Sequence, residues 1–163
     1  MQLNAKETTI IKSLLKIVKF VDGDGIILED IVSKKEFEVR LYGIDAPEIN
    51  YCKKIKKDEI ELQVPAALLI KLGYLSFNFL KDQVNLGDVC TLVQEQNNLV
   101  DKYGRLLGYL ILKDGRVLNE IMIKEGYAKP YNVVFCEMLP MYQEWNLQAK
   151  NSSKGLYSIV NKF

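Results

Sequence analysis

Three short segments of this sequence bring carboxylates, glycines and arginines together at spacings that could serve phosphate chemistry. The segments are Asp22 to Gly25, Arg40 to Glu48, and Asp101 to Arg105. Carboxylate oxygens suit hard cations such as Ca²⁺ or Mg²⁺, and a carboxylate can also orient or deprotonate a water molecule. Arginine presents a planar fork of N–H donors that matches phosphate oxygens. Together the segments contain the groups that hydrolysis of a phosphodiester requires.

Each segment also has an ordinary structural explanation when it is considered alone. Aspartate and glycine are common turn formers, so residues 22–25 could be a plain hairpin turn. Asp45 and Glu48 share one bend, where two acids repel each other unless a cation lies between them, but a solvated turn remains an equal alternative. Gly104 suits a sharp turn that leads into a hairpin. An EF-hand loop is excluded, because Ile26 stands where that loop needs a third oxygen ligand.

The composition excludes several catalytic classes. The 163 residues include no histidine, which removes Ser-His-Asp and Cys-His catalysis and histidine-based zinc sites. The net charge of +1 means that contact with nucleic acid must come from local clusters of charge. Three cysteines without a CxxC spacing predict neither a disulfide framework nor a zinc cluster. Among the 22 basic residues, the arginines are only Arg40, Arg105 and Arg116.

Hydrophobic periodicity predicts short strands interrupted by one long helix. Strands are expected at residues 17–21, 26–28, 36–42, 89–93, 106–112 and 116–118, and helices at 62–86, 119–125 and 137–150. Residues 36–42 alternate cleanly, so Arg40 should project from the face opposite the apolar side chains. This order is compatible with a small closed barrel of OB type, although periodicity alone leaves other α+β folds open.

In order and spacing, the three segments resemble the signature of the staphylococcal nuclease (thermonuclease) family. The matching strings are Val21-Asp22-Gly23-Asp24, Arg40 through Glu48 with its Asp-x-Pro-Glu, and Asp101-Lys102-Tyr103-Gly104-Arg105. Residues 117–128 are similar to the hairpin and helix that follow in that family, and the resemblance extends over roughly residues 16–154. It implies an α+β fold built on an OB-fold five-stranded β-barrel with about three α-helices.

The resemblance implies a calcium-dependent nuclease that cleaves DNA and RNA with little sequence preference and leaves 3′-phosphate ends. Carried over by position, Asp24 and Asp45 would bind Ca²⁺ through their carboxylates, and Ala46 through its backbone carbonyl. Glu48 would act on the attacking water, as general base or as its positioner.

The remaining carried-over positions concern the phosphate and the nucleotide. Arg40 and Arg105 would hold the phosphate and its pentacoordinate transition state. Lys102 and Tyr103 would flank the nucleotide, and Tyr131 would pack against a base. The lysine-rich segment at residues 50–61 departs from the best-known members, and it could be either a phosphate-tracking loop or a solvated run of charge.

The chain is expected to form a single nuclease domain, residues 1–163, and to act as a monomer on DNA and RNA, with single strands favoured. No apolar run approaches the length of a membrane span. Met1 to Phe20 lacks a signal-peptide pattern, so the chain as written is expected in the cytoplasm, or outside the cell if a signal was removed. The alternative is a catalytically weak or inactive OB-fold module that binds single strands. The full set of Asp24, Arg40, Asp45, Glu48 and Arg105 favours the enzyme.

Overall fold

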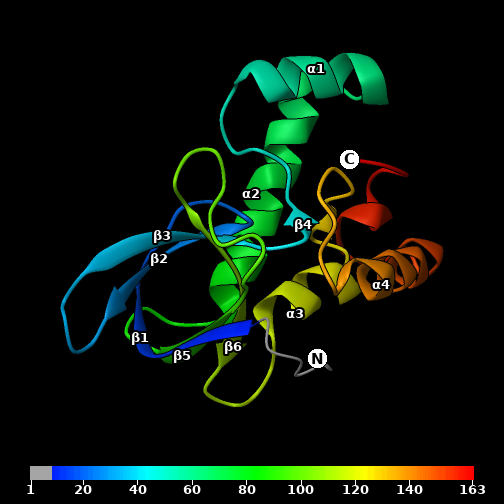
Figure 1. Cartoon of the computed structure of the whole chain (residues 1–163). Coiled ribbons are helices and arrows are strands. Elements are labelled where there is room, and N and C mark those ends of the chain that lie inside the picture. Colours follow the sequence, from blue (N-terminus) through cyan, green and yellow to red (C-terminus); the bar gives the residue numbers. More distant parts are fainter. Residues whose placement is uncertain (1–8) are drawn as a thin grey trace.

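A closed five-stranded barrel occupies one part of the molecule in the computed structural model, which describes residues 9–163 (Figure 1). Its strands follow the order β1-β2-β3-β6-β5, and all neighbours are antiparallel except the parallel pair β3 and β6. The bounds are β1 Thr9–Phe20, β2 Gly25–Asp30, β3 Glu36–Leu41, β5 Val89–Glu95 and β6 Leu106–Leu112. This confirms the α+β class with a five-stranded barrel.

Alternation along the strands fills the barrel interior. On β3, Val39 and Leu41 are fully buried, whereas Arg40 between them is only partly buried and projects from the other face, as predicted. Ile26 and Leu28 of the neighbouring β2 are fully buried in the same core. The apolar face of β3 therefore anchors the strand, and its polar face is available to the site.

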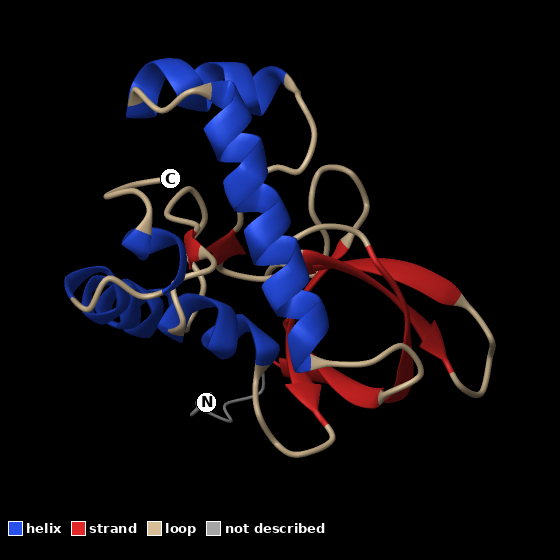
Figure 2. Ribbon diagram, turned by 180° about the vertical axis from the view of Figure 1, so that it is seen from behind, coloured by secondary structure: helices blue, strands red, loops and turns tan. Residues whose placement is uncertain are grey.

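Within residues 9–163, four α-helices and a second small sheet complete the fold. Figure 2 shows α2 running along one side of the barrel, with α3 and α4 gathered beside it. The two-stranded sheet pairs β4 with β7 in antiparallel fashion. The bounds are β4 Ile44–Asp45, β7 Lys129–Pro130, α1 Lys53–Leu62, α2 Ala66–Gln83, α3 Leu118–Lys124 and α4 Leu139–Asn151, followed by the 3₁₀ turn η1 Gly155–Ser158.

One helix was missed and one predicted strand was wrong. The long helix expected at about residues 62–86 is confirmed as the shorter α2, but the lysine-rich segment before it forms a further helix, α1, so residues 9–163 contain four α-helices where about three were expected. Pro65 cannot donate a backbone hydrogen bond, and Gln63 adopts a left-handed φ of 57°, so the two helices cannot be continuous. The strand expected at residues 116–118 is reduced to an isolated bridge between Ile111 and Val117, because α3 already begins at Leu118.

All three cysteines are free, as expected from their spacing. Over residues 9–163, no individual helix has both the length and the apolarity to cross a membrane, and only α1 and α2 taken together, bent by 111°, pass such a test. The prediction that Met1 to Phe20 carries no signal peptide includes residues 1–8, which lie outside the described part of the chain.

Helix α2 packs so closely on two loops that only glycine fits at the contacts. A Cβ atom on Gly23, in the turn between β1 and β2, would lie 2.7 Å from the Cβ of Ala46 and would also meet the Ser76 hydroxyl of α2. A Cβ on Gly73 of α2 would lie 2.6 Å from the carbonyl carbon of Glu48. The turn at residues 22–25 and the bend at residues 46–48 are therefore held against one helix.

We predict that Gly73→Ala destabilises the protein, although alanine is normally the better helix former by about 1 kcal/mol. The new methyl group must displace the backbone at Glu48, and such overpacking typically costs about 1–3 kcal/mol. Urea unfolding measures the change, with the exposed α2 variant Asn78→Ala as the matched control, expected within about 0.5 kcal/mol of the parent. A Gly73→Ala protein as stable as its parent would show that residues 47 and 48 are not packed on α2.

Candidate active site

Register in the barrel places Arg40 beside Asp24. The ladder between β2 and β3 pairs Gly25 with Arg40, so the arginine reaches the residue just before β2. Nη1 of Arg40 donates to Oδ1 of Asp24 at 2.9 Å, and the backbone N–H of Ala46 donates to Oδ2 at 2.8 Å. Asp24 is only 2% exposed, so both of its oxygens find donors inside the protein.

The same guanidinium also holds the carboxylate of β4. Nη2 of Arg40 donates to Oδ1 of Asp45 at 2.9 Å, and to the carbonyl of Ile44 at 3.4 Å. Asp45 is positioned by the pairing of β4 with β7, in which it faces Lys129. One arginine therefore brings two buried carboxylates from separate elements within the span of its fork.

The environment acts differently on the two carboxylates. Burial raises the pKa of Asp24 to about 7, although Arg40 opposes that shift. Burial would also raise the pKa of Asp45, but Lys54 and Arg40 outweigh it and hold that pKa below its ordinary value. Burial opposes the charge on Arg40, yet Asp24 and Asp45 raise its pKa, so the guanidinium stays charged.

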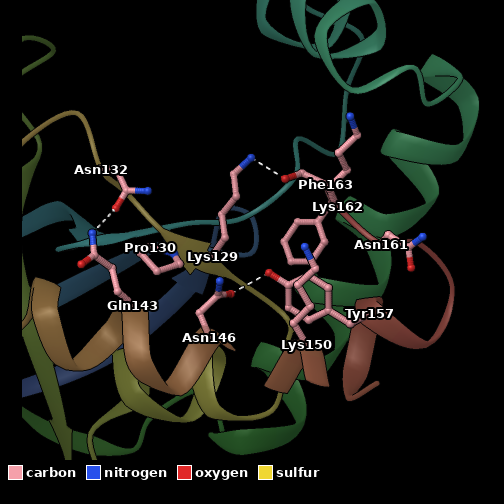
Figure 3. A pocket seen from close by; sticks show the side chains of 10 residues that line it. All are labelled: Lys129, Pro130, Asn132, Gln143, Asn146, Lys150, Tyr157, Asn161, Lys162 and Phe163. Carbon is pink, nitrogen blue, oxygen red and sulfur yellow. Dashed lines mark hydrogen bonds between the residues drawn. The ribbon is translucent and has the colours of Figure 1, made fainter. Parts of the chain in front are cut away.

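Two lysines that the sequence analysis did not place in the site also contact Asp45. Nζ of Lys54, near the start of α1, donates to Oδ1 of Asp45 at 2.8 Å and to Oε1 of Glu48 at 3.2 Å. Nζ of Lys129, on β7, lies 4.0 Å from Oδ2 of Asp45. Figure 3 shows that Lys129 also reaches the backbone oxygen of Phe163. Lys129 is distant from Asp45 along the chain, whereas Lys54 is only six residues from Glu48 and nine from Asp45, inside the lysine-rich segment at residues 50–61.

Arg105 is oriented by the turn that precedes β6. Oδ1 of Asp101 accepts the backbone N–H groups of Tyr103 and Arg105, and Oδ2 accepts Nε of Arg105 at 2.7 Å. Partial burial would raise the pKa of Asp101, but these hydrogen bonds outweigh burial and lower that pKa below its ordinary value. Nη1 of Arg105 lies 3.8 Å from Oε1 of Glu38. The sequence analysis gave Asp101 no role, although it holds Arg105 in place.

The parallel pairing of β3 and β6 sets where Arg105 lies relative to Arg40. Val39 is opposite Leu106 and Arg40 is opposite Leu107. Glu38, which contacts Arg105, is two residues before Arg40 on β3 and therefore projects from the same face. The two arginines thus belong to one side of the barrel, although no direct contact joins them.

Of the three residues predicted to contact the substrate, Lys102 and Tyr103 lie near Arg105, and Tyr131 lies near Arg40. Tyr103 is 72% exposed, and its ring lies 5.0 Å from Nζ of Lys102 and 5.6 Å from the guanidinium carbon of Arg105. Tyr131 follows β7, and its ring lies 5.7 Å from the guanidinium carbon of Arg40. An aromatic face therefore lies beside each arginine, which suits the stacking of bases.

A cavity of about 210 Å³ is lined by residues of β7, α4 and the C-terminal segment and does not include the predicted catalytic residues (Figure 3). Lys129 and Pro130 of β7 line one wall of the cavity. On another wall, Oδ1 of Asn146 accepts a hydrogen bond from the hydroxyl of Tyr157 at 2.6 Å. We place the chemistry at the carboxylate and arginine cluster, because the acidic and basic groups converge there and not in this cavity.

The oxygen atoms of this cluster suit a hard cation that takes only a few of its ligands from the protein. Asp24 and Asp45 supply carboxylate oxygens, and Ala46 lies beside them. Within residues 9–163, no three acidic, histidine or cysteine side chains converge as a ready metal cage. An ion held here would therefore keep much of its coordination shell as water or as substrate oxygen.

Residues 38–159 match the sequence profile of the family described as Staphylococcal nuclease homologue. The chain belongs to the staphylococcal nuclease family. The match begins on β3 and covers Arg40, the bend with Asp45 and Glu48, and the turn with Arg105, and so confirms the resemblance drawn from the sequence. Asp24 lies before the matched region, and its place in the site rests on its contacts with Arg40 and Ala46.

Several curated proteins are similar to most of this chain. An uncharacterized protein of Methanocaldococcus jannaschii is 30% identical over 154 residues, which are 90% of this chain and 72% of that protein. An uncharacterized endonuclease of Escherichia coli O157:H7 is 31% identical over 144 residues, which are 88% of this chain and 76% of that protein. The endonuclease YhcR of Bacillus subtilis is 31% identical over 143 residues, which are only 11% of its length.

The contacts of Arg40 predict a large effect on stability. Removal of one partner from a buried ion pair typically costs about 3–5 kcal/mol, because the remaining charge is left uncompensated. We expect Arg40→Met to lower the free energy of unfolding by that order, measured by urea denaturation. The matched control is Arg116→Met, whose pair with Asp114 is exposed and worth about 0–1 kcal/mol. Equal, small losses in both variants would contradict a central role for Arg40 in holding Asp24 and Asp45.

Proposed function

We propose that this chain is a calcium-dependent phosphodiesterase that cleaves DNA and RNA with little sequence preference and leaves 3′-phosphate ends. The observation that carries the proposal is the fork of Arg40, which holds Asp24 and Asp45 together on the same side of the barrel as Arg105. Membership of the staphylococcal nuclease family and relatives named as endonucleases support a nuclease.

In this proposal Asp24, Asp45 and the carbonyl of Ala46 bind the ion, and Glu48 orients or deprotonates the attacking water. A bound calcium ion would stabilise negative charge on the phosphate and help to place the water. Glu48 suits its role because its side chain is 31% exposed and can reach solvent, whereas Asp24 and Asp45 are buried.

The two arginines would bind the phosphate with different freedom. Arg40 already donates to Asp24, Asp45 and Ile44, so only its remaining N–H groups are open to a phosphate oxygen. Arg105 is held through Nε by Asp101, and the carboxylate of Glu38 lies 3.8 Å from its Nη1, beyond ordinary hydrogen-bond distance. We therefore assign to Arg105 the stronger gain of hydrogen bonding as charge builds on the phosphate oxygens.

Substrate would be held by phosphate contacts and by stacking. Lys102 and the exposed ring of Tyr103 would flank one nucleotide, and Tyr131 would pack against a base beside Arg40. Contacts of this kind are nearly blind to sequence, and they favour single strands, whose bases are free to stack. We expect the chain to act as a monomer.

The exposed Tyr103 between two cations also favours a second candidate, a module that binds single strands without cleaving them. Cleavage of plasmid DNA and of single-stranded RNA, with calcium and then with excess chelator, separates the two. The nuclease predicts cleavage that depends on calcium and stops in chelator. Full activity in chelator would remove calcium from the proposal, and binding without any cleavage would favour the module.

Arg105→Lys tests the arginine fork. Lysine keeps the charge but offers a point donor, so binding should remain close to that of the parent. Single-turnover cleavage should fall by about 10²–10³-fold, the scale for loss of one donor to a developing oxyanion. Arg116→Lys, outside the site, should leave both quantities unchanged. Equal effects of the two substitutions would remove Arg105 from the transition state.

A further inference from the structure

Lys54 occupies the position where two carboxylates of the proposed site converge. Its ammonium lies 2.8 Å from Oδ1 of Asp45 and 3.2 Å from Oε1 of Glu48. These are the groups to which the proposed function assigns the ion and the attacking water. A lysine ammonium bonded to both competes for the same oxygens that a divalent cation or its water would use.

Lys54 is far easier to displace than Arg40, the other cation on Asp45. Arg40 is bound by carboxylates from two elements, and its side chain is 16% exposed. The side chain of Lys54 is 33% exposed, and it ends in a compact ammonium on a flexible four-carbon stem. Its helix α1 buries only Ile55, so the ammonium can swing out without disturbing a large core.

Charge repulsion gives a reason for Lys54 to leave when an ion arrives. Arg40, Lys54 and Lys129 lie within hydrogen-bonding or ion-pair distance of the carboxylates of Asp24, Asp45 and Glu48. A divalent ion added to this cluster is repelled by every cation that remains. Departure of Lys54 removes a cation whose side chain is one-third exposed. It frees Oε1 of Glu48 from this donor and opens one acceptor position on Oδ1 of Asp45, which keeps its bond from Arg40.

We propose that Lys54 is an internal competitor for the ion site, and that its displaced ammonium binds a phosphate of the nucleic acid substrate. Ion and substrate then bind cooperatively, because the phosphate stabilises the position of Lys54 that leaves the carboxylates free. The inference rests on the proposed function of the same site, and it assigns to Lys54 a role in positioning and selectivity. It makes the site retain calcium weakly until a phosphodiester is present.

The neighbouring Lys57 provides a matched control. It lies on the same helix, its side chain is 70% exposed, and its ion pair is with Glu61 at 3.5 Å. Lys57→Gln and Lys54→Gln change the net charge equally. Lys54→Arg keeps the cation at the site and so separates loss of charge from a general disturbance of α1.

The experiment is calorimetric titration of calcium into the parent and the three variants, alone and with saturating adenosine 3′,5′-bisphosphate, after thermal melts have shown that each is folded. We expect Lys54→Gln to bind calcium at least about tenfold more tightly than the parent without nucleotide. The nucleotide should tighten calcium binding in the parent, and this enhancement should shrink in Lys54→Gln. Lys57→Gln and Lys54→Arg should keep the affinity of the parent within about threefold.

The outcomes distinguish this inference from the proposed function. Calcium binding of equal or lower affinity in Lys54→Gln, with calcium-dependent cleavage in the parent, overturns the role of Lys54 and leaves the nuclease intact. Equal tightening in Lys54→Gln and Lys57→Gln reduces the effect to net charge and also overturns it. Absence of calcium binding in every variant, with cleavage that resists chelator, overturns both proposals. Tight binding in Lys54→Gln alone supports both.

Discussion

The bond of one guanidinium to two buried carboxylates is the constraint on which the rest of this structure depends. Asp24 and Asp45 are 2% and 6% exposed, and two such charges close together repel strongly unless a cation joins them. Arg40 supplies that cation from β3, because the β2–β3 register places it opposite Gly25 and so beside Asp24. A slip of one residue at this ladder would turn Arg40 toward the core and remove its bonds to both carboxylates. The fold and the charge cluster therefore support each other.

The elements outside the barrel keep the two carboxylates within reach of that fork. Helix α2 packs on the turn at Gly23 and on the bend at Glu48. The amide of Asn119, fully buried on α3, donates to the carbonyls of Tyr42 and Gly108 and accepts the N–H of Leu110. It thus ties α3 to the end of β3 and to β6, the strand that Arg105 precedes. Asn119 therefore supports the β3–β6 pairing that keeps the two arginines on one side of the barrel.

Local patterns were sufficient for the parts of the fold that are governed by local forces. Alternation at residues 36–42 predicted both β3 and the outward face of Arg40, and the order of the three motifs predicted the family. Helix α1 was missed because only Ile55 of it is buried, which leaves no apolar stripe to detect. The two-residue strands β4 and β7 are too short to have a period. Lys129 was missed because it is distant from Asp45 along the chain. Lys54 was missed because it is one of several lysines in the segment before α2, and only the fold shows which of them reaches Asp45 and Glu48.

The cluster contains cations of two physical kinds, and the distinction explains why its arginines and lysines are not interchangeable. Arg40 satisfies two fixed carboxylates at once with a rigid planar fork, so its loss costs structure before it costs chemistry. Lys54 and Lys129 reach the same carboxylate on flexible stems and are about one-third exposed, so water has access to both ammonium groups. The site therefore combines a fixed arginine with two exchangeable lysines. Arg40 sets where the carboxylate oxygens lie, and Lys54 and Lys129 set how readily another cation can bind to those oxygens.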